Sequence, residues 1–201
     1  MPQAKRRPSV PTPSSDQVDL ALDLWQTSNN FVHYRAHEKS LKKLFSATHP
    51  TNNNIDEVLI KVAALNDFYG TNLKGSFEVA SRIIDINVDG RLSAGDLTVV
   101  GEIALVTKRS GRKMRYYSFA TKYCSHHRPT VFQIYDSFAD MMLSHFKPDG
   151  FSNFEADDLK DYPTYVRVID EFMGHYALTA YNRWEIDKYL WVMGKQHFEK
   201  R

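Results

Sequence analysis

The chain has 201 residues, of which 42% are apolar and 25% are charged, a balance typical of a globular protein with a sizeable core. Its net charge of +2 excludes a nucleic-acid-binding protein that is basic over its whole surface, but it does not exclude a local basic patch. No apolar run is long enough for a transmembrane helix, and a single cysteine excludes an intrachain disulfide and a cysteine-based zinc site. We therefore expect a cytoplasmic protein with no membrane association.

The first segment differs in composition from the rest of the chain. Residues 1–15 hold four of the eight prolines, three cations and no acidic residue. Such a segment buries too little apolar surface to offset the entropy of ordering. We predict a disordered, basic, Pro-rich tail over residues 1–15 and a single all-helical domain over residues 16–201.

Apolar residues recur at helical spacing through most of that domain. Asn54 precedes one such run, with Glu57 three residues later as in a capping box, and the run ends at Gly70. No segment shows the alternation typical of strands, so the predicted fold class is all-α. The other expected helices begin at Asp16 and at His33 or cover residues 76–84, 97–104, 117–124, 137–143, 162–174 and 182–197.

A basic stretch is the strongest electrostatic feature of the sequence. Residues 103–135 contain no Asp or Glu, and Thr107–Lys113 is predicted as a short turn between two helices. A DNA phosphate is bound by cations and by the backbone N–H groups of a helix N-terminus, and such a turn can supply both. The alternative interpretation of this basic stretch is a solvated loop. The candidate DNA-contacting residues are Lys108, Arg109, Gly111, Arg112, Lys113, Arg115, Ser118, His126, His127 and Arg128.

Asp136 ends the acid-free stretch and directly precedes an apolar helix. As an N-cap, its carboxylate accepts backbone N–H bonds and stays ionised beside the positive helix end. A carboxylate held in this way next to a phosphate-binding turn can stabilise a cationic sugar or activate water. The alternative interpretation of Asp136 is a helix cap only.

Residues 85–96 form a separate motif. Asp85, Asn87, Asp89 and Gly90 match the start of a calcium-binding loop, and Asp96 occupies its twelfth position, where Glu is usual. A calcium site and a polar interhelical turn, with Gly90 in a left-handed conformation, are the two interpretations.

Several runs of the chain resemble one family. These runs are similar to small bacterial proteins related to the 8-oxoguanine branch of the helix-hairpin-helix DNA glycosylases, over about residues 30–197. They are Val58-Leu59-Ile60-Lys61, residues 65–72, Gly95-Asp96, Ser118-Phe119-Ala120-Thr121-Lys122-Tyr123-Cys124, Pro129, residues 132–137 and residues 185–195.

The resemblance implies a two-lobed helical fold with a cleft between the lobes and a hairpin that grips the DNA backbone. It implies that Asp136 is the catalytic carboxylate and that aromatic residues hold an extruded base, for which we select Tyr69, Tyr135 and Trp191. The family's Gly-x-Gly hairpin is reduced to Gly111, and its iron–sulfur cysteines are absent, so we expect no cofactor and no metal.

Some relatives add a lysine that attacks the sugar, and two lysines are candidates here. Lys113 follows Gly111, whereas Lys122 lies inside a predicted helix after small and apolar residues. A buried Lys122 needs a partner, and an ion pair with Asp136 would keep the amine protonated and unreactive. We therefore predict a monofunctional glycosylase in which Lys122 positions Asp136.

The predicted function is excision of a damaged or modified base from double-stranded DNA by a monomer, which leaves an abasic site. Oxidised guanine is the substrate that the resemblance implies, and a hypermodified phage base, in antiviral defence, is the second. One alternative is a non-catalytic DNA-binding protein with the same fold, and its cleft would be filled by Trp191 or other side chains. The other is a calcium-binding helical protein.

Overall fold

The computed structural model describes residues 9–199, and this part of the chain is mostly helical, as expected. Its α-helices are α1 (Ser15–Thr27), α2 (Val32–Lys43), α3 (Ile55–Tyr69), α4 (Ser76–Asp85), α5 (Val88–Ala94), α6 (Val99–Ala104), α7 (Tyr117–His127), α8 (Ser137–Phe146), α9 (Tyr162–His175) and α10 (Arg183–Phe198). Short helical turns are η1 (Asn29–Phe31), η2 (Leu44–Thr48), η3 (Lys147–Asp149) and η4 (Asp158–Lys160).

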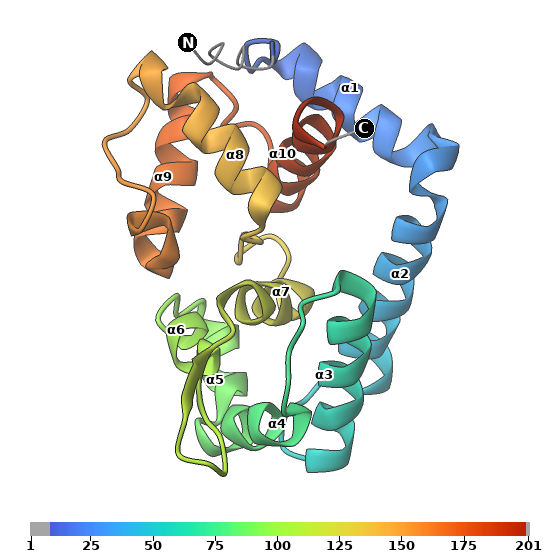
Figure 1. Ribbon diagram of the computed structural model, residues 1–201. Helices are drawn as coiled ribbons and strands as arrows, with labels where there is room; N and C mark the ends of the chain where they lie inside the picture. Colours follow the sequence, from blue (N-terminus) through green and yellow to red (C-terminus); the bar gives the residue numbers. More distant parts are fainter. Residues whose placement is uncertain (1–8, 200–201) are drawn as a thin grey trace, which may run out of the picture.

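The helices form two groups (Figure 1). The upper group contains α1, α8, α9 and α10, and the lower group contains α3 to α7. Helix α2 runs along one side from the upper group to the lower one, and the segment between α7 and α8 joins the groups at their centre. Helix α10 packs against α1 and α8, whereas α7 packs against α6 and α3.

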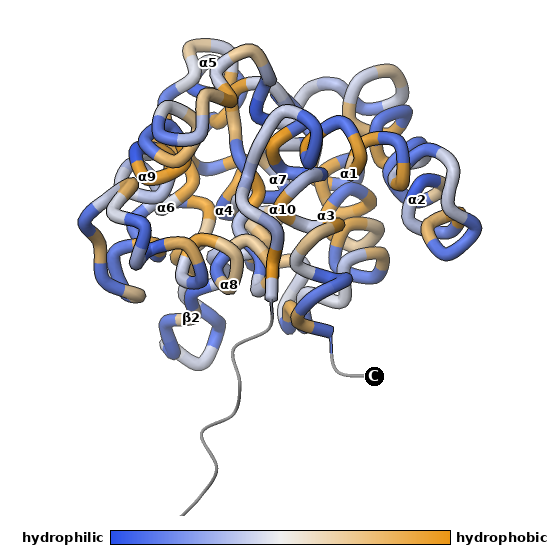
Figure 2. Tube along the Cα trace, turned by 90° about the horizontal axis from the view of Figure 1, so that it is seen from above, coloured by the Kyte–Doolittle hydropathy of each residue, from blue (hydrophilic) through white to orange (hydrophobic). Residues whose placement is uncertain are grey.

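Local sequence signals explain where several helices begin and end. The side chain of Asn54 accepts hydrogen bonds from the backbone of Asp56 and Glu57 at the start of α3. Gly70 ends α3 in a left-handed conformation, with φ of 56°, that favours glycine. The hydrophobic residues gather on the inner faces of the helices (Figure 2), and the middle of α10 is buried over most of its circumference.

The tail predicted over residues 1–15 lies only partly within the described residues, which begin at residue 9. Within them, Val10 packs against the core and Pro13 is buried. Ser14 caps α1 by accepting a hydrogen bond from the backbone of Gln17. Within the described residues, helix α1 thus begins at Ser15, one residue before the predicted boundary.

The turn predicted at Thr107–Lys113 is present, but it is the loop of a β-hairpin that the sequence did not predict. Strands β1 (Leu105–Thr107) and β2 (Lys113–Arg115) pair antiparallel, and Val106 faces the core between exposed neighbours. Gly111 lies in the connecting loop with φ of 79°, a left-handed conformation that favours glycine. Three-residue strands show too short an alternation to be recognised in the sequence.

The calcium loop over residues 85–96 does not form. Residues 88–94 are helical, and Asn87, not Gly90, adopts the left-handed conformation. Asp89 accepts hydrogen bonds from Asn52, whereas Asp96 pairs with Arg91. The carboxylates therefore point to different partners, and no group of three or more His, Cys, Asp or Glu residues within 9–199 could hold a metal ion.

Gly194 permits the close approach of α8 and α10. A Cβ atom at this position would lie 2.6 Å from Cβ of Phe138, nearer than real contacts allow. We expect Gly194→Ala to lower the free energy of unfolding by about 1–3 kcal/mol, measured by urea denaturation. Gly101→Ala, in α6 with nothing within 4 Å of its Cβ, should raise it by about 0.5–1 kcal/mol. Equal effects of the two variants would contradict the prediction.

Candidate active-site cleft

A cavity of about 490 Å³ opens between the two groups of helices. Helices α2, α7 and α10, the end of α3 and the start of α8 supply its walls. It brings together Lys122 and Asp136, the two predicted catalytic residues, with predicted Ser118, Tyr69 and Trp191. The other lining residues are Trp25, Tyr34, His37, Glu38, Phe68, Gly70, Thr71, Ile134, Ser137, Phe138, Asp187, Lys188, Lys195 and Glu199.

Asp136 is the N-cap of α8, as predicted. Its Oδ1 atom accepts hydrogen bonds from the backbone N–H groups of Phe138 and Ala139, each at 2.9 Å. Both bonds and the positive end of the helix dipole stabilise the ionised carboxylate. The side chain is only partly buried and lines the cavity, so the carboxylate is held in one orientation beside open space.

Lys122 is buried in α7, with 4% of its surface exposed. Its Nζ atom donates to Oγ of Ser118 at 2.6 Å and lies 5.3 Å from the centre of the Tyr69 ring. Burial lowers the pKa of the ammonium group, and the nearby charges of Asp136 and Asp187 only partly oppose this shift.

The predicted ion pair between Lys122 and Asp136 is not among the salt bridges of residues 9–199. The cap geometry explains this difference, since Asp136 turns its Oδ1 atom toward the backbone of α8, while Ser118 accepts from Lys122. The amine is therefore desolvated without a directly paired carboxylate. This environment favours a neutral amine more than the predicted pair would.

Asp187 and Lys188 form the opposite wall, and sequence reasoning missed both. Burial raises the pKa of Asp187 to about 7, although Lys188 opposes the shift. Nζ of Lys188 lies 2.8 Å from Oε1 of Glu38 and 3.6 Å from Oδ2 of Asp187. The sequence did contain a signal for this site, namely two adjacent charged residues in the apolar middle of a predicted helix. Buried charges are rare unless they are paired or functional, so such a pair indicates a candidate site.

Aromatic rings form a further part of the cavity lining. Trp191 contacts Tyr34 and Trp25, with ring centres 4.8 and 5.5 Å apart, and His37 stacks on Phe68 at 4.2 Å. Such faces suit a flat ligand, which can stack on them.

Tyr135 does not line the cavity, although it was predicted to hold the base. Its hydroxyl donates to Asp140, and its ring packs against Tyr117 and Tyr165. The prediction failed because Tyr135 precedes Asp136 in extended backbone, so that neighbouring side chains point to different sides.

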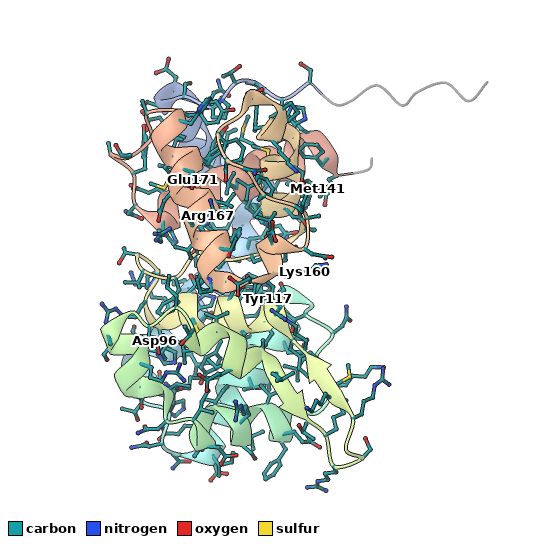
Figure 3. The ribbon with its side chains drawn as sticks, turned by 90° about the vertical axis from the view of Figure 1, so that its left-hand side faces the viewer. Asp96, Tyr117, Met141, Lys160, Arg167 and Glu171 are labelled. Carbon is teal, nitrogen blue, oxygen red and sulfur yellow. The ribbon has the colours of Figure 1, made fainter. Side chains whose placement is uncertain are left out.

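Six of the predicted DNA-contacting residues lie on the β-hairpin or its loop, at a distance from the cleft along the lower group (Figure 3). None of the cations among them makes a salt bridge within the described part of the chain. Only Arg115 reaches the upper group, where it donates to the backbone carbonyl of Lys160 and lies over the ring of Tyr117. These residues are Lys108, Arg109, Gly111, Arg112, Lys113 and Arg115.

His126 and His127 do not form cationic phosphate contacts at neutral pH. Burial lowers the pKa of each to about 3, and nearby lysines add to the shift. Nε2 of His126 is hydrogen-bonded to the hydroxyl of Tyr69 at 3.0 Å. Arg128 is exposed and donates to the carbonyl of Ser93, so it stays available at the surface of the lower group.

No helix within residues 9–199 is long and apolar enough to cross a membrane. No solved structure matches the chain. The chain is 41% identical over 148 residues to an uncharacterized protein of Haemophilus influenzae. The aligned region covers 73% of this chain and 70% of the relative. Neither this relative nor the matching family carries a description of an activity, so the glycosylase resemblance stays a prediction. The family HI_0787_N, described as an N-terminal domain, matches residues 17–131, and the chain belongs to this family.

Proposed function

We propose that the protein is a DNA glycosylase that accepts an extruded, modified base in the cleft between its two groups of helices. One observation carries the proposal: Asp136 and Lys122 face the same cavity of about 490 Å³, whose lining also includes several aromatic rings. A cavity of this kind suits a flipped nucleotide, which stacks on aromatic side chains while its sugar meets the polar residues.

Asp136 has the properties that cleavage of a glycosidic bond requires. Two backbone N–H groups at the start of α8 hold its carboxylate in one orientation. As the bond to the base breaks, positive charge develops on the sugar, and a fixed carboxylate stabilises that charge without reorganising.

Lys122 has the properties of a nucleophile. Attack of its neutral Nζ on C1′ would form a carbon–nitrogen bond and expel the base with the bonding electron pair, and the base would take up one amine proton. Cleavage of the C1′–O4′ bond would then open the sugar to an imine between Nζ and C1′, and the second amine proton would pass to O4′. Since the Lys122–Asp136 pair behind our monofunctional prediction is not observed, we extend the proposal to this covalent step. The lowered pKa of Lys122 supports it, because only the unprotonated amine can attack.

The two substrates that the sequence left open are still candidates, namely an oxidised purine and a hypermodified phage base. The cavity carries both charged groups and aromatic rings, which suit the polar edge and the flat face of either base. The alternative of a non-catalytic DNA-binding protein predicts a cleft filled by side chains such as Trp191. An open cavity with Asp136 on its wall favours the enzyme.

The assay that tests the proposal treats duplex DNA with the protein and then with hot alkali, which cleaves at abasic sites. The substrates are DNAs with oxidised, alkylated or deaminated bases and phage DNA with glucosylated cytosine. Mass spectrometry of the released bases identifies the substrate. Absence of both cleavage and released base from all of them would contradict the proposal.

Binding to the DNA backbone is assigned to the hairpin. We expect Arg112→Ala, which removes an exposed cation, to reduce the slope of log K against log salt by about one unit, measured by fluorescence anisotropy on duplex DNA. Arg167→Ala is the matched control, because Arg167 is exposed on α9 and pairs with Glu171, away from the hairpin (Figure 3). An unchanged slope for Arg112→Ala would contradict the assignment.

A further inference from the structure

A second cavity, of about 650 Å³, lies next to the cleft. Its walls come from α2, the end of α7, the segment that follows α7, and the start of α10. Trp25, Glu38, Tyr69, Ile134 and Lys188 line both cavities and form the wall between them. Hydrogen bonds hold this wall together: Glu38 accepts from Nε1 of Trp184 at 2.9 Å as well as from Lys188.

The cationic character of the second cavity comes from one face of α2. Arg35, Lys39 and Lys42 are spaced by four and three residues, so they lie on the same side of the helix. Glu38 is the single acid among the lining residues, and Lys188 already neutralises it. The residues that line the cavity therefore carry a net positive charge.

These three cations of α2 differ in their hydrogen-bond partners within the protein. The guanidinium of Arg35 donates to the backbone carbonyls of Trp25 and Ser28 at 2.6 and 2.9 Å. Lys39 and Lys42 are exposed at the rim, and their ammonium groups make no hydrogen bond or salt bridge within the described residues. Two free ammonium groups beside a fixed guanidinium suit a doubly charged phosphate better than a single carboxylate.

Flat apolar surfaces occupy the interior. Trp184 is oriented by its bond to Glu38, and His126 is neutral and oriented by Tyr69. Pro129 adds an apolar edge at the rim. A ligand with an aromatic ring can pack on these surfaces while its anionic group meets α2.

We propose that the second cavity binds a nucleotide, with its base inside the cavity and its phosphate on Lys39 and Lys42. The nucleotide can be free in solution or part of a single DNA strand, since both present the same ring and phosphate. The inference does not depend on base excision, because it uses no residue assigned to catalysis.

The test is isothermal titration calorimetry with two probes, dGMP and an unmodified single-stranded oligothymidylate. We expect the double variant Lys39→Glu/Lys42→Glu to weaken binding of at least one probe by about tenfold or more, since it reverses two charges at the rim. Lys43→Glu is the matched control, because Lys43 is exposed on the same helix and lines neither cavity. Its dissociation constants should stay within about twofold of the wild-type values.

The two probes separate the two sources. Binding of dGMP that depends on Lys39 and Lys42 assigns the cavity to a free nucleotide, and binding of the oligonucleotide alone with that dependence assigns it to a strand. The proposal is overturned if neither probe binds at millimolar concentration. It is also overturned if Lys195→Ala, which changes only the cleft, weakens binding while the double variant does not. Circular dichroism of each variant verifies its fold, and no modified base or turnover is required.

Discussion

Asp136→Asn is expected to lower the single-turnover rate of base release by about 10²–10³-fold while the protein stays folded. Asn is as good an N-cap as Asp, so the hydrogen bonds to the backbone of Phe138 and Ala139 persist. The variant removes only the negative charge that would face the developing cation on the sugar. The rate is measured on the substrate that the alkali assay identifies, with enzyme in excess.

Asp161→Asn is a matched control for this substitution. Asp161 caps α9 by accepting from the backbone of Thr164, and it does not line the cleft. Its rate should equal that of the wild type. If both variants react at the wild-type rate and melt at the wild-type temperature, Asp136 is a helix cap only.

Lys122→Met is expected to eliminate a covalent protein–DNA adduct that borohydride traps from the wild-type protein. Borohydride reduces the imine between Nζ and C1′, and methionine retains the length of the lysine side chain without its amine. Burial lowers the pKa of Lys122, so at any given pH more of its amine is neutral than for an exposed lysine, and trapping should fall as pH decreases and the amine becomes protonated. Denaturing electrophoresis of labelled DNA detects the adduct.

Lys113→Ala distinguishes the two candidate lysines. Lys113 is exposed on β2 and lies outside the cleft, so its variant should retain the adduct. Loss of the adduct in Lys113→Ala, with retention in Lys122→Met, would reverse the assignment. A wild-type protein that releases base but forms no adduct would restore the monofunctional mechanism.

Local patterns determined much of the helical structure. Asn54 and Asp136 cap helices at the predicted positions because an N-cap requires only a short polar side chain beside the first free N–H groups. Gly70 ends α3 because it adopts the left-handed conformation at little cost. The candidates Asp136 and Lys122 were also identified in the sequence, Asp136 from its position at a helix start together with the family resemblance, and Lys122 through that resemblance.

Properties that depend on distant contacts were decided only by the tertiary structure. Burial against η2 and α3 lowers the pKa of His126 and His127, and no local pattern reports how deeply a histidine is buried. The burial of Lys122 next to Ser118, with no ion pair to Asp136 in the described residues, was likewise decided by the tertiary structure.

The cleft itself shows the same division. The sequence by itself determined that Tyr69 and Trp191 belong to helical segments rich in apolar residues, and that Asp136 begins another. Only the packing of α10 against α1 and α8 brings Asp187 and Lys188 opposite Lys122, because they lie far apart along the chain. Side-chain charge and helix propensity are local properties, whereas a cavity exists only where separate elements fail to fill the space between them.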